Sequence, residues 1–291
     1  CSSDLLSDRI ASKSRKVLLF GSPKSGKTQL AGELSKEFNL IWFDLEAGVD
    51  TLLKLPPEQQ ERIEVIDLPD TRSYPIAIET MLKVIKGGNT KICETHGKVG
   101  CSLCIKESAP FVEIELNKLP LNTVVVVDSL TQLTNSAIAF ITKNQADDYK
   151  LTYDDWGNLG KLMDTFLSHI QQAPYHVVCI SHETEAELED GKMKLVPVAG
   201  TKAFSRNTAK YFSEVIYCEV KNKKHIAASS TLYSGNILTG SRTGAVLETE
   251  AQASLIPIFK GEIKPVNVMT ANTPATQAVS KLQQLRDGMK K

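Results

Sequence analysis

The sequence contains no long hydrophobic run and no excess of charge of either sign. No apolar stretch approaches the roughly 18 to 20 residues of a membrane-spanning helix, and the first segment, CSSDLLSDRIASKSRK, lacks the apolar centre of a signal peptide. Lysine plus arginine equals aspartate plus glutamate at 34 each, so nucleic-acid binding would need a local basic patch. We therefore expect a cytoplasmic protein with no membrane partner.

The pattern of apolar segments predicts an α/β core. Apolar strands alternate with helical segments, as in a central, mostly parallel β-sheet flanked by helices. We expect strands at 16–20, 40–46, 63–68, 121–130, 175–183 and 213–220, short antiparallel strands within 223–248, and helices at 27–38, 74–87, 153–173 and 202–212. The expected division is an N-terminal extension (1–15), a core (16–261) with an insertion at 88–108, and a flexible C-terminal tail (262–291).

The segment GSPKSGKT, between the first expected strand and helix, fits the phosphate-loop pattern G-x-x-x-x-G-K-[ST]. Its glycines let backbone N–H groups turn toward phosphate oxygens, and the following helix presents its positive end. Lys27 would reach the terminal phosphates, and Thr28 would ligate magnesium. The expected nucleotide-binding residues are Gly21, Ser22, Pro23, Lys24, Ser25, Gly26, Lys27, Thr28 and Gln29.

A phosphate loop also needs a second acidic group for the magnesium shell. Asp128 ends the most apolar strand, VVVVD, and is the expected Walker B residue. The sequence has no Asn-Lys-x-Asp motif for reading guanine, so ATP is the expected nucleotide.

The stretch WFDLEAGVD distinguishes between classes of P-loop protein. Glu46 ends the strand after the P-loop helix, where a carboxylate can orient water or accept its proton. In the position of this glutamate, the sequence resembles the RecA-like recombinases. Those proteins place their catalytic glutamate in a similar Asp-x-Glu stretch, and their Walker B strand also runs into Asp-Ser. In AAA+ ATPases the glutamate would follow Walker B directly, where this sequence has Ser129.

The resemblance covers about residues 15 to 250 and most closely matches phage RecA-like single-strand annealing proteins. It implies that His182, in VVCISHE, senses the γ-phosphate. The TGSRTG segment is similar to the K-x-R motif of DnaB-type helicases, although Gly240 stands at the lysine position. The similarity makes Arg242 a candidate arginine finger, which would contact the ATP of a neighbouring subunit. The implied assembly is a homo-oligomer, a ring or short filament, with ATP at subunit interfaces, in a phage protein of a bacterial host.

The same resemblance implies two DNA-binding loops, at 134–154 and 184–205. The first carries Lys143, Tyr149, Lys150 and Tyr153, suited to phosphates and stacked bases, although tyrosines at such positions also pack between helices. The second opens with ETEAELEDG, which would repel phosphate. Its basic residues come later: Lys192, Lys194, Lys202, Arg206 and Lys210.

The insertion contains the spacing C-x2-H-x4-C-x2-C, formed by Cys93, His96, Cys101 and Cys104. Two close pairs joined by a short spacer can converge tetrahedrally on structural zinc, with no position left open for catalysis. Lys86, Lys91, Lys98 and Lys106 surround it, either as a contact for DNA or a partner or as a solvated face. Cys179 and Cys218 lie in apolar strands and are expected to be core residues.

Three functions remain open. The leading hypothesis is an ATP- and magnesium-dependent RecA-like protein that acts on single-stranded DNA in phage recombination, annealing or repair, with a single-strand-binding protein as a further partner. The second is a hexameric helicase or helicase-loader motor. The third is a nucleotide-switched assembly protein without DNA activity.

Overall fold

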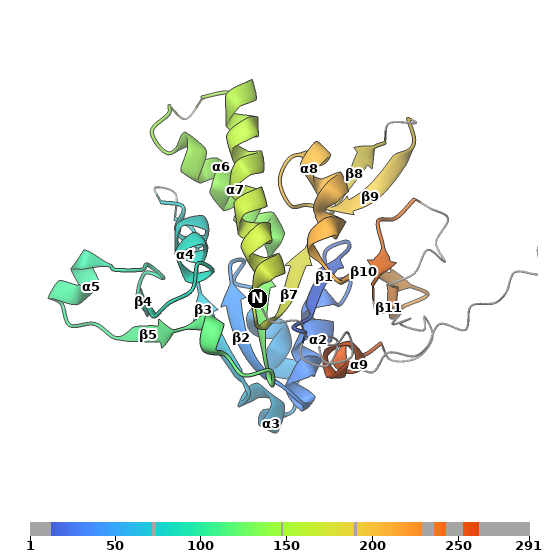
Figure 1. Cartoon of the computed structure of the whole chain (residues 1–291), viewed down its shortest axis with the longest axis horizontal. Coiled ribbons are helices and arrows are strands. Elements are labelled where there is room, and N and C mark those ends of the chain that lie inside the picture. The colour runs from blue at the N-terminus through green and yellow to red at the C-terminus, as the bar shows by residue number, and fades with distance from the viewer. Residues whose placement is uncertain are drawn as a thin grey trace, which may run out of the picture.

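A single large sheet organises the protein. The computed structural model describes residues 13–71, 74–146, 148–188, 191–228, 236–242 and 253–261. The sheet has the strand order β11-β10-β1-β7-β6-β2-β3, with β12 paired to β10 (Figure 1). Its parallel strands are β1 (Lys16–Phe20), β2 (Asn39–Asp44), β3 (Ile63–Asp67), β6 (Thr123–Asp128), β7 (His176–Ser181) and β10 (Glu214–Lys221). The antiparallel strands are β11 (Lys224–Ala228) and β12 (Gly240–Ser241).

Helices cover both faces of this sheet, because side chains alternate along its strands. Leu18 and Phe20 of β1 face one core, whereas Val17 and Leu19 face the other. The first core is closed by α4 (Ile76–Val84), α6 (Leu130–Thr142), α7 (Tyr153–Gln172), α8 (Lys202–Asn207) and the 3-10 turns η3 (Leu116–Lys118) and η4 (Thr208–Tyr211). The second is closed by α2 (Lys27–Gly32), η1 (Glu33–Lys36), η2 (Val49–Lys54) and α9 (Ile256–Lys260), with α3 (Pro57–Gln60) beside η1. The predicted central, mostly parallel sheet flanked by helices is confirmed.

The strand order brings distant segments to one edge. β7 lies between β1 and β6, and β2 lies on the other side of β6. In the register, Phe20 is opposite Ser181, and Asp44 is opposite Asp128. Because the carboxyl ends of parallel strands meet at the same edge, the residues that follow these strands converge there.

Several predicted elements differ from the observed ones. The helix expected at 202–212 ends at Asn207 and continues as η4, and much of the loop expected at 184–205 forms a two-stranded hairpin. The helix expected at 27–38 ends at Gly32 and continues as η1. A Cβ on Gly32 would lie 2.5 Å from Leu52 Cδ2, so glycine allows η2 to pack closely on α2. The loop expected at 134–154 is wrong in its first part, because α6 continues to Thr142. Its start is capped by Ser129, whose hydroxyl accepts a hydrogen bond from the Gln132 N–H at 3.2 Å.

Two small hairpin-like units extend from the core (Figure 1). The insertion consists of β4 (Thr90–Cys93), α5 (Ser102–Lys106) and β5 (Phe111–Ile114), with β4 antiparallel to β5. β5 lies just past the expected 88–108 range. At the carboxyl edge, β8 (Glu183–Glu187) pairs with β9 (Met193–Pro197). None of the helices in the described part of the chain is long and apolar enough to cross a membrane.

Candidate functional site

The P-loop turns sharply between β1 and α2. Gly21 and Gly26 have φ angles of 151° and 92°, which favour glycine. A Cβ on Gly21 would lie 1.9 Å from the Cys218 carbonyl oxygen, so only glycine fits beside β10. Lys27 Nζ donates to the carbonyl oxygens of Gly21 at 2.9 Å and Ser22 at 2.8 Å. Burial lowers the pKa of this lysine. The loop and its lysine thus form one compact unit at the carboxyl end of β1.

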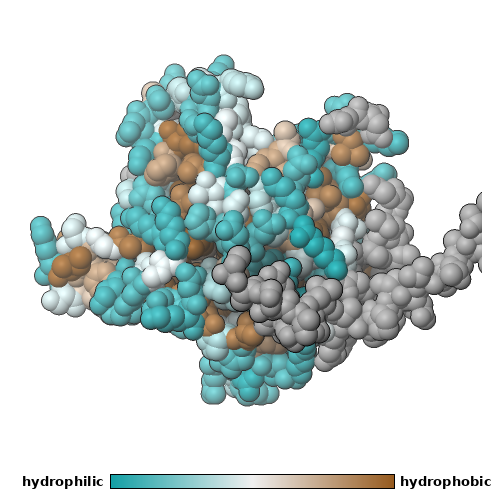
Figure 2. All heavy atoms as spheres, viewed as in Figure 1, coloured by the Kyte–Doolittle hydropathy of each residue, from teal (hydrophilic) through white to brown (hydrophobic). Residues whose placement is uncertain are grey.

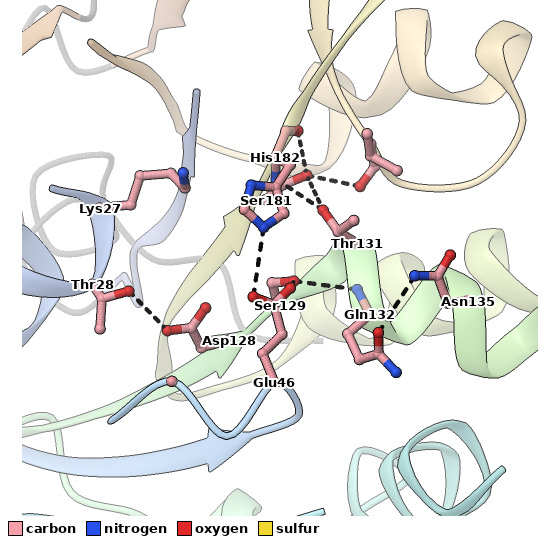
Figure 3. A network of polar contacts seen from close by, with 12 residues as sticks. Lys27, Thr28, Glu46, Asp128, Ser129, Thr131, Gln132, Asn135, Ser181 and His182 are labelled. Atoms are coloured by element: carbon pink, nitrogen blue, oxygen red, sulfur yellow. Dashed lines mark hydrogen bonds and ion pairs between the residues drawn. The ribbon is translucent and has the colours of Figure 1, made fainter. Parts of the chain in front are cut away.

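Thr28 and Asp128 meet at the floor of the site. Thr28 Oγ1 donates to Asp128 Oδ2 at 3.1 Å (Figure 3). Asp128 is only 5% exposed, and burial, reinforced by the nearby Glu46 carboxylate, raises its pKa to about 7. A hydroxyl and a buried carboxylate are oxygen ligands of the kind that magnesium prefers. These two predicted magnesium ligands therefore lie where one ion can contact both.

Glu46 is positioned by the turn that follows β2. Asp44 Oδ1 accepts a hydrogen bond from the Glu46 N–H at 3.0 Å, and Asp44 Oδ2 accepts one from the Gly48 N–H at 3.0 Å. This turn directs the Glu46 carboxylate toward the end of β6, where the Ser129 hydroxyl donates to Oε1. His182 Nε2 lies 3.5 Å from Oε2 (Figure 3). The contact with His182 first, and that with Ser129 second, lowers the pKa of Glu46 against the opposing effect of burial.

His182 connects this carboxylate to two further elements. Its backbone N–H donates to Thr131 Oγ1 of α6 at 2.8 Å. Its carbonyl oxygen accepts from the Val198 N–H at 2.9 Å, just past β9. The neighbouring Ser181 hydroxyl donates to the Val198 carbonyl oxygen at 2.8 Å. The end of β7 is therefore bonded to both α6 and the β8–β9 hairpin.

The structure brings most of the predicted nucleotide residues into one cavity of about 1010 Å³. Pro23, Lys27, Glu46, Asp128 and His182 all line it. The arrangement can hold a triphosphate against the loop, with a carboxylate at its far end. The assigned roles stay predictions.

Sequence reasoning missed one wall of this cavity, the β10–β11 turn. Lys223, Lys224 and His225 line it, and a Cβ on Gly26 would lie 2.8 Å from His225 Nδ1. Asn222 and Lys223 have φ angles of 51° and 62°, as in a tight hairpin turn. The signal was present in KNKK, a turn-forming asparagine among lysines directly after an apolar strand. Strand order was needed to place that turn beside the P-loop.

Arg242 lies apart from these residues. Ser241 of β12 pairs with Glu214, which begins β10, so Arg242 is at the amino edge of the sheet. Its Nη2 donates to the Lys210 carbonyl oxygen at 2.8 Å. The P-loop is at the opposite edge, so Arg242 does not reach its own chain's nucleotide site. A role toward a neighbouring subunit stays a prediction.

The insertion gathers a second candidate site. One ligand atom from each of Cys93, His96, Cys101 and Cys104 lies within 4.8 Å of all the others. Cys93 comes from β4 and Cys104 from α5, and both are buried. A hydrogen bond from the Cys104 N–H lowers the pKa of Cys101 to about 7, which favours a thiolate. Three sulfurs and one imidazole fit a closed, four-coordinate zinc site. Cys179 and Cys218, by contrast, are 0% and 2% exposed within the core.

The chain belongs to the family described as AAA domain, which matches residues 13–252. With the sheet and the phosphate loop, this makes the protein a P-loop ATPase. No curated protein matches the chain.

Proposed function

We propose that the protein is a magnesium-dependent, RecA-like ATPase that acts on single-stranded DNA in phage recombination, annealing or repair. One observation supports the proposal: the carboxylate that lines the cavity together with the P-loop comes from Glu46, just after β2, and Ser129 after Asp128 holds it. An ATPase with its glutamate directly after Walker B would not need this contact.

The nucleotide would be held by the P-loop amides and Lys27. In this structure Lys27 Nζ donates to two carbonyl oxygens of its own loop. Phosphate oxygens are stronger acceptors for a cationic amine, so the lysine would turn to the terminal phosphates when ATP binds. Thr28 and Asp128 would hold magnesium, which neutralises charge on the β- and γ-phosphates.

Glu46 would position the attacking water and accept its proton. Because the His182 contact lowers its pKa, the carboxylate is ionised at neutral pH. Ser129 and His182 fix the two oxygens, so the base is oriented before substrate arrives. His182 directly precedes β8. A change in the Glu46–His182 contact on hydrolysis would therefore move the β8–β9 hairpin.

The carboxyl edge has features that suit single-stranded DNA. Tyr153 is 91% and Trp156 41% exposed at the start of α7, where bases can stack. Glu185 and Glu187 are exposed on either side of the buried Ala186 in β8, so these two acids face away from the core, whereas Glu183 contacts Tyr217. The phosphate contacts would therefore come from β9 and α8, through Lys194, Lys202 and Arg206.

The decisive experiment measures ATP turnover with and without single-stranded DNA, beside an annealing assay. We expect DNA to stimulate turnover and annealing to proceed. Glu46→Gln should lower turnover at least about a hundredfold while ATP still binds, because the water loses its base. Glu61→Gln, an exposed site outside the nucleotide cavity, is the matched control. Turnover retained in Glu46→Gln, or no DNA affinity at low salt, would contradict the proposal.

For the insertion we propose structural zinc. The four candidate ligands leave no open position, and the segment has few apolar residues of its own to bury. Zinc would therefore stabilise the β4–α5–β5 unit rather than take part in hydrolysis.

A further inference from the structure

The insertion forms a polar cavity against α4, separate from the nucleotide site. The cavity has a volume of about 430 Å³, within the range of known ligand pockets. Tyr74, Glu79 and Lys83 line one side, and Lys98, Gly100 and Leu103 line the other. Thr80 Oγ1 of α4 donates to the Gly97 carbonyl oxygen at 2.7 Å, which fixes the insertion to the helix. The cavity walls therefore come from two elements held together.

The charge of this cavity is unbalanced. Glu79 is the single carboxylate among its described lining residues, and it already accepts from the Tyr74 hydroxyl and pairs with Lys143 at 3.3 Å. Lys83 forms no ion pair within the described part of the chain. Lys98 Nζ lies 3.7 Å from the centre of the Tyr74 ring and contacts no carboxylate of the described residues. Within that part of the chain, two lysines thus face the cavity without an acidic partner.

An apolar side chain borders the same cavity. Leu103, one of its lining residues, is 50% exposed on the short helix α5. Figure 2 shows apolar atoms at the outer end of the insertion, among polar surroundings. Exposed aliphatic side chains beside cations are typical of a surface that binds another polypeptide.

We propose that this surface, formed by Lys83, Lys98 and Leu103, binds a partner protein through a short acidic segment with a large apolar side chain. The carboxylates would pair with the lysines, and the apolar group would cover Leu103. Nucleic acid fits less well, because the Tyr74 ring is already covered by Lys98 and the exposed apolar groups are aliphatic. The chain's own residues 262–291 do not fit either, since they carry five basic and two acidic residues.

The test uses the full chain and a fluorescein-labelled peptide of three aspartates followed by leucine and phenylalanine, measured by fluorescence anisotropy. We expect binding that weakens by roughly tenfold or more in Leu103→Asp and in Lys83→Glu, since each removes a central contact. Leu53→Asp, which is 69% exposed elsewhere, and Lys161→Glu are the matched controls and should bind like the wild type. Unchanged zinc content and ATP turnover would show that the variants fold.

Three outcomes would overturn the proposal. The first is equal binding of a peptide with lysines in place of aspartates. The second is loss of oligo(dT) binding in Leu103→Asp and Lys83→Glu, which would assign the surface to nucleic acid. The third is peptide binding only after removal of residues 1–12, whose DLLSD stretch has the same chemistry and would then be the natural occupant.

Discussion

Ser129 makes two contacts at the end of β6. Its hydroxyl donates to Glu46 and accepts from the Gln132 N–H, so one side chain both caps α6 and orients the Glu46 carboxylate. His182 contacts the other carboxylate oxygen from β7. Three strands therefore determine the direction of one carboxylate.

The pH dependence of turnover should report the His182 contact. The pKa of Glu46 is lowered chiefly by this histidine, so the acidic limb of the kcat profile should lie below the ordinary range of a glutamate. His182→Ala should move that limb to higher pH and lower kcat by roughly tenfold at neutral pH, because the carboxylate loses its orientation.

His169→Ala, in the exposed part of α7, is the control and should leave the profile unchanged. An acidic limb at the same pH in His182→Ala would show that the contact does not tune the base.

At the scale of elements, the space available to the P-loop is restricted by β10, the strand beside it. The Cys218 carbonyl oxygen of β10 approaches Gly21 so closely that a methyl group cannot fit. We predict that Gly21→Ala lowers ATP affinity at least about tenfold, because the loop must shift away from β10. Gly48→Ala is the matched control, since nothing lies within 4 Å of its Cβ position and its φ is −108°. Titration with a fluorescent ATP analogue measures both, and equal affinities would contradict the prediction.

If the insertion holds the proposed zinc, its fold should depend on the metal. Cys104→Ser should lose bound zinc, and limited proteolysis should then cut between residues 88 and 115 first, because the segment has no large core of its own. Cys179→Ser, in the main core, is the comparison and should keep its zinc.

Mass spectrometry of the intact protein and zinc analysis read out both variants. If protein purified without chelator contained no zinc, the site would not have the proposed structural role.

At the scale of the whole molecule, Arg242 and the P-loop lie at opposite edges of one sheet. A finger role for Arg242 therefore requires a second copy of the chain. We predict that Glu46→Gln and Arg242→Ala are each weakly active alone and that mixing them restores turnover. A mixed interface can pair an intact base from one copy with an intact arginine from the other. Turnover of the mixture no higher than that of either variant would exclude Arg242 as a finger in trans.

Local pattern was sufficient for much of this protein. The apolar runs specified the parallel strands, and GSPKSGKT and the C-x2-H-x4-C-x2-C spacing each identified a compact site, because their residues are close along the chain. The helix expected through residue 38 ends at Gly32, where Leu52 packs closely. Local pattern does not reveal this contact, because the two residues are far apart along the chain. Helix α6 replaced part of an expected loop for a similar reason, since it packs on α4 and α7.

The sequence by itself determined the phosphate loop, the Cys/His cluster of the insertion and the class of sheet, since short-range spacing and side-chain periodicity encode them. Only the tertiary structure decided that Ser129 and His182 hold Glu46, that the β10–β11 turn lies against Gly26, and that Arg242 is at the far edge. These facts depend on which strands are neighbours, and strand order results from packing the whole core rather than from any single segment.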